Sequence, residues 1–463
     1  MYKITINHVK NLHEFEELIK VFLKPSDYIL CQDEREVEEV PYEKSIFVPE
    51  FLTEHFEGSK ERNAIKQYLY DALCDYTGMR PDWGIHTGVR PVKQLFDLVD
   101  REGSLEKAQD VLCHYFRMSK EKVALLTHVY HTQRAVMTES PLNAVGIYIG
   151  IPFCPTRCVY CSFTSNKGTD KQIERYMDAL FKEISYVGKK LKEKGFYPES
   201  IYMGGGTPTT LSAAQLDRLL IHVAAQFNLE NLKEFTVEAG RPDTITREKL
   251  DILKGHDVNR ISINPQSMKL ETLDRIGRSH GPEEIIEGFK MAREVGIPII
   301  NADIIAGLPG ETTADFIDTV KKVIALEPEN ITVHTMALKR ASRLKEIDHE
   351  FNYKQGQTVR EMLDEGKKAL FEAAFHPYYL YRQKQMTGNF ENVGYAKVAT
   401  EGIYNIRIME EHQTMIALGA GGITKVYYPD ENRLERVPNV SNYEIYIERL
   451  DEMLERKEKN LFK

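Results

Sequence analysis

From about residue 145 onward, short hydrophobic runs alternate with longer stretches in which hydrophobic residues have helical spacing. After the first run, side chains recur at intervals of three and four residues, which predicts an amphipathic helix with Asp170 as its N-cap. Its apolar stripe is Ile173, Tyr176, Met177, Leu180, Phe181, Ile184 and Val187. Strands are predicted at 145–149, 200–203, 234–238, 260–263, 299–305 and 330–334.

Repeated strand–helix units predict an α/β fold with a parallel sheet and right-handed crossovers. About six such units over 141–340 predict a partial (β/α)6 barrel. We expect residues 1–140 to form a separate mixed α/β extension, and 341–463 to form a mainly helical region that covers the substrate. Within the extension, strands are expected near 3–8 and 28–31, helices at 59–73 and 105–136, and a loop at 84–91.

Composition narrows the class of protein. At 463 residues the chain is too long for one ordinary core, and its 42% hydrophobic and 28% charged residues fit a globular protein. A net charge of −9 argues against a general nucleic-acid binder. No apolar stretch approaches the roughly 20 residues of a membrane span. The alternating first residues do not resemble a signal peptide. Free thiols lead us to expect a cytoplasmic protein.

Three of the six cysteines follow the first predicted strand with C-x3-C-x2-C spacing: Cys154, Cys158 and Cys161. Thiolates this close in sequence can converge on one soft metal centre. A [4Fe–4S] cluster normally takes four cysteine ligands, so three would leave one iron open to another ligand. A disulfide framework is disfavoured in a long, cysteine-poor chain, and a structural zinc site would need a second Cys or His pair. The scattered Cys31, Cys74 and Cys113 are expected to be small buried hydrophobic residues.

Other candidate groups also lie where predicted strands end, which is where barrels of parallel strands carry their chemistry. The run 204–208, Gly-Gly-Gly-Thr-Pro, lets a ligand lie against bare backbone, and it lacks the Gly-Lys-Ser/Thr of a nucleoside-triphosphate loop. Carboxylates accept hydrogen bonds from amines and ribose hydroxyls, and an arginine such as Arg278 clamps a carboxylate. S-adenosylmethionine carries all of these groups. The strand-end residues are Glu238, Gln266, Asp303 and His334.

These motifs resemble the radical S-adenosylmethionine superfamily and, within it, the oxygen-independent coproporphyrinogen III oxidase family. The resemblance is firm over 145–340 and looser over 386–395 and 417–425. Its segments are Tyr148-Ile149-Gly150-Ile151-Pro152-Phe153-Cys154, Gly204-Gly205-Gly206-Thr207-Pro208-Thr209, Arg260-Ile261-Ser262-Ile263-Asn264-Pro265-Gln266-Ser267, Gly277-Arg278-Ser279-His280 and Asn301-Ala302-Asp303-Ile304-Ile305-Ala306-Gly307-Leu308-Pro309-Gly310.

The resemblance implies a radical S-adenosylmethionine barrel that binds two cofactors. Cys154, Cys158 and Cys161 would hold a catalytic [4Fe–4S] cluster. The residues implied to bind S-adenosylmethionine are Tyr148, Phe163, Gly205, Gly206, Thr207, Glu238, Gln266, Arg278 and Asp303.

The implied reaction is oxidative decarboxylation of coproporphyrinogen III propionates to vinyl groups, which forms protoporphyrinogen IX in haem biosynthesis. An electron-donor protein is the implied partner. Arg340 and Arg343 follow the sixth strand, and we expect them to bind the carboxylates of the tetrapyrrole.

Two departures from the family pattern leave alternatives open. Phe163 stands where the best-studied oxidases have a fourth cysteine, and Gly150 stands where the family has His. The first departure is shared with a haem-chaperone branch, so binding and transfer of haem is one alternative. Another is radical methylation or ring opening of a tetrapyrrole. The N-terminal extension and the segment 419–425 resemble a branch described as a second coproporphyrinogen dehydrogenase.

Overall fold

The computed structural model describes residues 1–7, 9, 11–32, 42–52, 59–138, 141–161, 165–337, 355–383 and 386–462. The chain forms two compact units. Unit 1 comprises Met1–Tyr130 with Tyr381–Lys384 and Gly388–Phe390, and unit 2 comprises His131–Leu380, Gln385–Thr387 and Glu391–Lys463. Within the described ranges, no helix is long and apolar enough to cross a membrane.

Unit 1 contains a three-stranded parallel sheet in the order β2 (Tyr28–Cys31), β1 (Tyr2–Thr5) and β3 (Lys44–Phe47). Its core joins this sheet to two helices through buried residues such as Ile4, Phe15 and Leu69. The helices and turns are α1 (His13–Phe22), η2 (Glu50–Leu52), α2 (Ser59–Thr77), α3 (Pro91–Glu102), α4 (Leu105–Asp110), η3 (Val111–Tyr115) and the first part of α5 (Lys120–Thr138).

The continuous helix predicted over 105–136 is wrong, because the chain breaks between η3 and α5. Arg117 adopts a left-handed backbone conformation, with φ of 60°, which ends the first helical stretch. The Ser119 hydroxyl then accepts a hydrogen bond of 3.3 Å from the Lys122 N–H at the start of α5. Hydrophobic spacing continues across the break, so periodicity alone does not reveal it.

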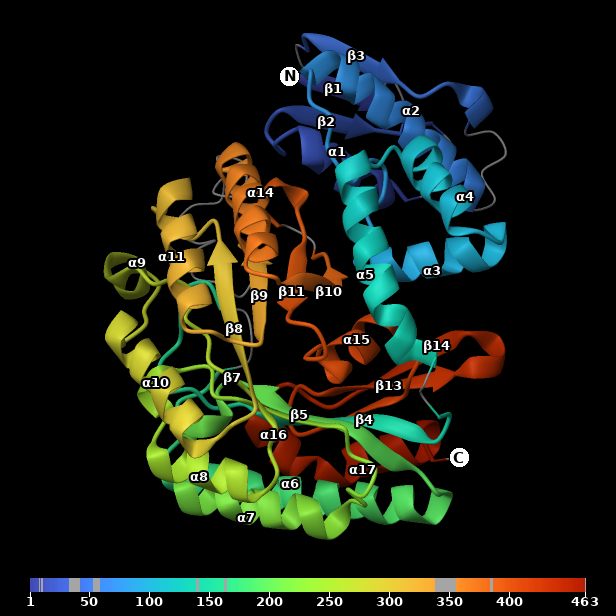
Figure 1. Ribbon diagram of the computed structural model, residues 1–463. Helices are drawn as coiled ribbons and strands as arrows, with labels where there is room; N and C mark the ends of the chain where they lie inside the picture. Colours follow the sequence, from blue (N-terminus) through green and yellow to red (C-terminus); the bar gives the residue numbers. More distant parts are fainter. Residues whose placement is uncertain are drawn as a thin grey trace. The chain divides into compact units, whose positions relative to one another are not determined.

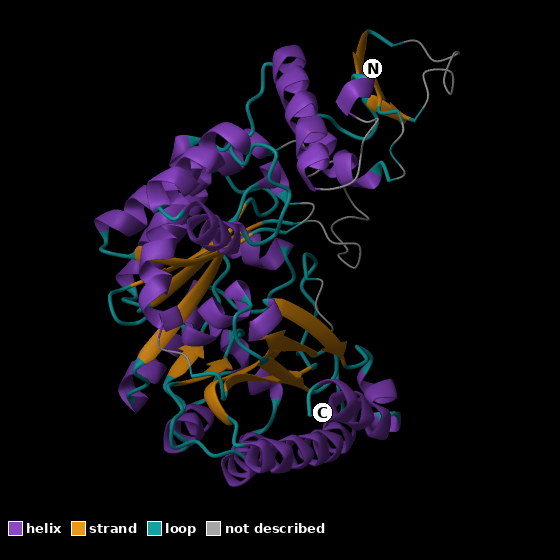
Figure 2. Cartoon of the chain, turned by 90° about the vertical axis from the view of Figure 1, so that its right-hand side faces the viewer, coloured by secondary structure: helices purple, strands orange, loops and turns teal. Residues whose placement is uncertain are grey.

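Unit 2 is built on six parallel strands that follow one another in chain order and confirm the predicted strand–helix pattern (Figures 1 and 2). Helices α6 (Asp170–Lys194), α7 (Ala213–Gln226), α8 (Arg247–Gly255), α10 (Pro282–Val295) and α11 (Thr313–Ala325) form a curved outer layer around this open sheet. The short elements are η4 (Pro208–Thr210), η5 (Pro242–Thr244) and α9 (Leu270–Arg275). The strands are β4 (Ala144–Ile151), β5 (Tyr197–Gly205), β6 (Glu234–Glu238), β7 (Arg260–Ser262), β8 (Ile299–Ala306) and β9 (Asn330–Thr335).

The C-terminal part contains strands as well as the expected helices, and these strands extend both edges of the sheet. Strand β12 (Met415–Leu418) pairs in parallel with β4, and β13 (Ile423–Tyr428) and β14 (Arg433–Pro438) follow in antiparallel pairs. At the other edge, β11 (Asn392–Ala396) pairs antiparallel with β9, and β10 (His376–Tyr381) is outermost. The helices are α14 (Gly356–Glu372), α15 (Ile403–Glu410), α16 (Tyr443–Glu448) and α17 (Leu450–Asn460), with short turns η6 (Thr387–Asn389) and η7 (Pro429–Glu431).

Buried polar contacts attach α15 to the start of the central strands. The Ile403 N–H donates to Glu234 Oε2 at 2.6 Å, and Arg260 Nη2 donates to Thr400 O at 2.8 Å. Arg260 also bonds the Asn330 side chain. These contacts anchor α15 and the segment before it to the amino-terminal ends of the strands.

The long helix α6 begins one residue earlier than its predicted cap suggests. Thr169, not Asp170, is the N-cap, and it forms a reciprocal capping box with Gln172. A threonine hydroxyl satisfies an orphan helix N–H as well as a carboxylate does, so both residues were plausible caps. The predicted apolar stripe is buried, apart from a half-buried Phe181.

A fully buried ion pair locks α17 onto α6. Lys457 Nζ lies 2.8 Å from Glu183 Oε1, and both side chains are 0% exposed. Lys457 also donates to Asn439 Oδ1 at 2.8 Å, while Tyr446 donates to Glu183 at 2.6 Å. The charges are therefore both paired and hydrogen-bonded, as buried charges have to be.

Lys457→Ala should lower the free energy of unfolding by about 3–5 kcal/mol, because it leaves the Glu183 carboxylate buried without its cation. Lys459→Ala is the matched control, since the Lys459–Glu455 pair is exposed and should contribute less than about 1 kcal/mol. Chemical denaturation followed by circular dichroism measures both. Equal destabilisation by the two variants would contradict a structural role for the buried pair.

Candidate functional site

The three clustered cysteines lie in a loop directly after β4. The loop returns along itself, with the Cys154 N–H donating to Asn166 O at 3.0 Å and the Cys161 N–H donating to Cys158 O at 3.2 Å. A third bond, from the Val159 N–H to Ile276 O at 3.1 Å, ties the loop to the end of α9. The backbone thus places all three thiols at the carboxyl end of the parallel sheet.

The triple-glycine turn after β5 packs against the cysteine loop through its backbone. The Gly206 N–H donates to Ile151 O and the Thr207 N–H donates to Phe153 O, both at 2.8 Å. A Cβ atom on Gly206 would lie 2.5 Å from Phe153 O and 2.9 Å from Cys154 Sγ, so no side chain fits there. Gly205 has φ of 119°, which also favours glycine. Bare backbone is needed here to seat the cysteine loop.

The thiols have unequal surroundings. Cys158 is 8% exposed, whereas Cys154 and Cys161 are half-buried. Burial raises the pKa of the Cys154 thiol to about 11, the Thr207 hydroxyl at 3.5 Å opposes this shift, and Cys161 and Cys158 raise the pKa further. Among the residues that the structure describes, no three His, Cys, Asp or Glu side chains form a group that could hold a metal ion. The fit to an iron–sulfur cluster therefore rests on donor chemistry. Three thiols lie in one loop, and the charges of Cys158 and Cys161 affect the pKa of Cys154.

Two carboxyl groups, Glu238 on β6 and Asp303 on β8, lie on the two strands that flank β7, and their pKa values are shifted in opposite directions. Burial raises the pKa of Glu238 to about 7, the Tyr202 O–H donor at 2.7 Å lowers it, and the charge on Asp303 raises it. Burial also acts to raise the pKa of Asp303, but His334 at 3.5 Å and Asn301 at 2.8 Å outweigh it and the net shift is downward. The site thus combines one carboxyl group whose pKa is lowered with one whose pKa is raised.

Three tyrosines form a stacked wall beside Glu238. The rings of Tyr148 on β4 and Tyr202 on β5 are 6.3 Å apart at 15°, and Tyr202 and Tyr404 on α15 are 4.6 Å apart at 23°. Sequence analysis singled out only Tyr148. Its partners were missed because Tyr202 looks like an ordinary strand residue and Tyr404 is distant in sequence. The Tyr202 ring stacks with both of its neighbours and Tyr404 is 7% exposed, so the three rings pack chiefly against one another.

Gln266 and Arg278 are both buried on this side of the sheet. Gln266 has φ of 66° and is held by β8, because its N–H donates to Asp303 O at 2.9 Å and its carbonyl accepts from Ile305 at 3.0 Å. Arg278 Nη1 donates to Asn264 O at 2.7 Å and Gly240 O at 3.1 Å. Its Nε is buried without a partner among the described residues, which leaves one donor for a ligand.

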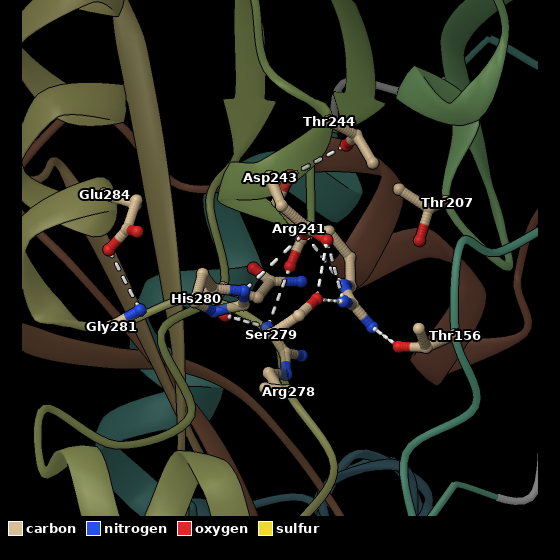
Figure 3. A network of polar contacts seen from close by, with 12 residues as sticks. Thr156, Thr207, Arg241, Asp243, Thr244, Arg278, Ser279, His280, Gly281 and Glu284 are labelled. Atoms are coloured by element: carbon tan, nitrogen blue, oxygen red, sulfur yellow. Dashed lines mark hydrogen bonds and ion pairs between the residues drawn. The ribbon is translucent and has the colours of Figure 1, made fainter.

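Sequence analysis missed a polar network centred on Arg241 (Figure 3). The guanidinium bonds Asp243, Thr156 and Ser279, which come from three different segments. Conversely, Phe163, Arg340 and Arg343 lie outside the described residues, so their roles stay predictions. Cys31 and Cys74 are buried as expected, and Cys113 is half-buried.

Comparison with known proteins identifies the family. The sequence model described as "Radical SAM superfamily" matches residues 148–323. The chain is 39% identical over 415 residues to the "Oxygen-independent coproporphyrinogen-III oxidase-like protein HemZ" of Bacillus subtilis, covering 89% of this chain and 83% of that protein. The chain belongs to this radical SAM family. Members of the superfamily use a [4Fe–4S] cluster and S-adenosylmethionine.

Two further relatives show how far the likeness extends. "Heme chaperone HemW" of Lactococcus lactis is 36% identical over 203 residues, which is 44% of this chain and 51% of that protein. The solved structure of "Coproporphyrinogen III oxidase (HemN) from Escherichia coli" superposes with a TM-score of 0.54 at 24% identity, over 70% of this chain and 73% of that one. This structural match shows that the fold is shared.

Gly206→Ala should reduce the iron and sulfide retained after anaerobic reconstitution, because the new methyl group displaces Phe153 O and Cys154 at a cost of about 1–3 kcal/mol. Gly255→Ala at the end of α8 is the control, since a Cβ there meets nothing within 4 Å. Equal iron contents would show that the turn does not position the cysteine loop.

Glu238→Gln should change how stability depends on pH. Because the folded pKa is about 7 and the ordinary value is 4.5, the folded chain keeps a proton that the unfolded chain releases. Wild-type stability should therefore fall by roughly 1–3 kcal/mol as pH rises between these two values, and level off above them. Urea denaturation of the cofactor-free protein measures this pH dependence. The free energy of unfolding should fall less with rising pH in Glu238→Gln than in the wild type, whereas the exposed Glu248→Gln should behave like the wild type. Parallel profiles for all three proteins would contradict the raised pKa.

Proposed function

We propose that this protein is a radical enzyme that decarboxylates coproporphyrinogen III propionates to vinyl groups, yielding protoporphyrinogen IX for haem biosynthesis. The observation that carries the proposal is the 89% of the chain aligned with the oxidase-like protein of Bacillus subtilis. That alignment is too long to be confined to the radical SAM segment at 148–323. The haem-chaperone relatives align with less of the chain, 44% for the protein of Lactococcus lactis and 62% for that of Escherichia coli.

The proposed roles follow the arrangement at the sheet edge. Cys154, Cys158 and Cys161 hold the cluster, and the backbone at 205–207 receives the methionyl end of S-adenosylmethionine. Glu238, Gln266 and Asp303 form hydrogen bonds with the polar groups of S-adenosylmethionine. The Nε of Arg278 donates to its carboxylate. Tyr148 lies beside the cofactor, and Phe163 offers backbone contacts to adenine. When bound, the two cofactors supply the radical that removes a hydrogen atom from a propionate.

The chain's own residues then orient the substrate and exclude water. Each propionate loses a hydrogen atom, one electron and carbon dioxide, so an electron acceptor is required. Arg340 and Arg343 are proposed to bind the propionates. We further propose a cytoplasmic location and an electron-donor protein as partner.

A second candidate is haem trafficking, favoured by the likeness to haem chaperones and by Phe163 in place of a fourth cysteine. In that role the protein would bind haem and pass it to an acceptor. Another radical reaction on a tetrapyrrole is the remaining alternative.

Anaerobic incubation of the reconstituted protein with coproporphyrinogen III, dithionite, S-adenosylmethionine and a one-electron acceptor should convert the substrate, with sequential loss of formic-acid equivalents in the mass spectrum. Cys158→Ala should abolish the conversion, because it removes a cluster ligand. Arg340→Gln with Arg343→Gln should raise the KM for substrate while cofactor cleavage continues.

The same preparation separates the alternatives. Cofactor cleavage with unchanged porphyrinogen would contradict the oxidase. A stoichiometric change in the Soret band during titration with haem would then favour trafficking.

A further inference from the structure

Arg241 is a buried cation whose role the proposed function leaves open. It follows β6 by three residues, precedes the turn η5, and is 3% exposed. A buried guanidinium is costly unless its donors are satisfied, so its partners indicate what the fold uses it for.

Asp243 holds one side of the guanidinium in a bidentate pair. Arg241 Nε donates to Asp243 Oδ1 at 3.0 Å, and Nη2 donates to Oδ2 at 2.9 Å. Ser279 donates to the same carboxylate at 3.1 Å, and His280 Nδ1 lies 3.6 Å from it. Asp243 therefore fixes the direction in which the remaining nitrogen of Arg241 points (Figure 3).

That remaining nitrogen, Nη1, faces the cysteine loop. It donates to Thr156 Oγ1 at 2.6 Å and lies 4.0 Å from Cys158 Sγ. Thr156 in turn donates to Gly277 O at 3.4 Å, which orients its hydroxyl as an acceptor for Arg241. Cys158 is the most buried of the three thiols, so a charge beside it is poorly screened by solvent.

We propose that Arg241 is a positioning residue that presents positive charge to the Cys158 sulfur and raises the reduction potential of the cluster. The inference rests on the proposed ligation by Cys154, Cys158 and Cys161. Hydrogen bonds to cluster sulfurs and nearby net charge set such potentials, because the reduced cluster carries one more electron and gains more from a neighbouring cation. The Arg241–Asp243 pair is neutral overall, but its positive end faces the sulfur.

The test is an anaerobic EPR redox titration of the reconstituted full chain without tetrapyrrole. Arg241→Gln should lower the equilibrium constant for reduction of the cluster about tenfold. For a one-electron couple this change corresponds to a midpoint potential about 59 mV more negative. Arg241→Lys keeps the charge and should restore part of the shift. Asp243→Asn leaves the guanidinium uncompensated and should shift the potential in the opposite direction. Arg247→Gln is the control, because that arginine is exposed and pairs with Asp251 and Glu294.

Opposite shifts for Arg241→Gln and Asp243→Asn would support electrostatic tuning, since a purely structural role predicts that both variants lose iron alike. Unchanged potentials in Arg241→Gln at full iron content would overturn the inference. Should Arg241→Gln fail to retain iron, the Asp243→Asn potential decides alone, and a negative or absent shift overturns the proposal. Iron content of the wild type tests the ligation separately, and porphyrinogen turnover tests the proposed function separately.

Discussion

The site depends on the backbone contact between the cysteine loop and the triple-glycine turn. Two short hydrogen bonds join them, from Gly206 to Ile151 and from Thr207 to Phe153, and a methyl group at Gly206 would collide with both Phe153 O and the Cys154 sulfur. Strands β4 and β5 are neighbours in the parallel sheet, so their loops leave from the same edge. The fold therefore brings the thiols and the bare backbone together.

Two carboxyl groups and two buried arginines lie along that same edge of the sheet. His334 and Asn301 lower the pKa of Asp303 against the effect of burial, whereas burial raises the pKa of Glu238. Arg278 and Arg241 are both buried near the cysteine loop, with their donors fixed by backbone carbonyls and by Asp243 respectively. This distribution suits a ligand with an amine, hydroxyls and a carboxylate, since each of these groups finds a complementary partner.

Hydrophobic periodicity predicted the six central strands and α6, because buried parallel strands and amphipathic helices have strong signals. It also placed the candidate residues at strand ends. The resemblance to known motifs then assigned these residues to one cofactor site. Three features could not be read in this way. The break at Arg117 is a single backbone conformation inside a periodic stretch. Strand β12 pairs with β4 across more than 250 residues of sequence, and β13 and β14 follow it. Arg241 gains meaning only from Thr156 and Ser279, which lie far away in sequence.

We propose that three thiols at the end of β4 hold a cluster with one iron open to S-adenosylmethionine. This proposal is tested most directly by the EPR spectrum of the reduced, anaerobically reconstituted protein before and after that ligand is added. We expect a cluster signal whose g-values change on addition. A protein that retains no iron and sulfide, or a cluster signal that the ligand leaves unchanged, would contradict it.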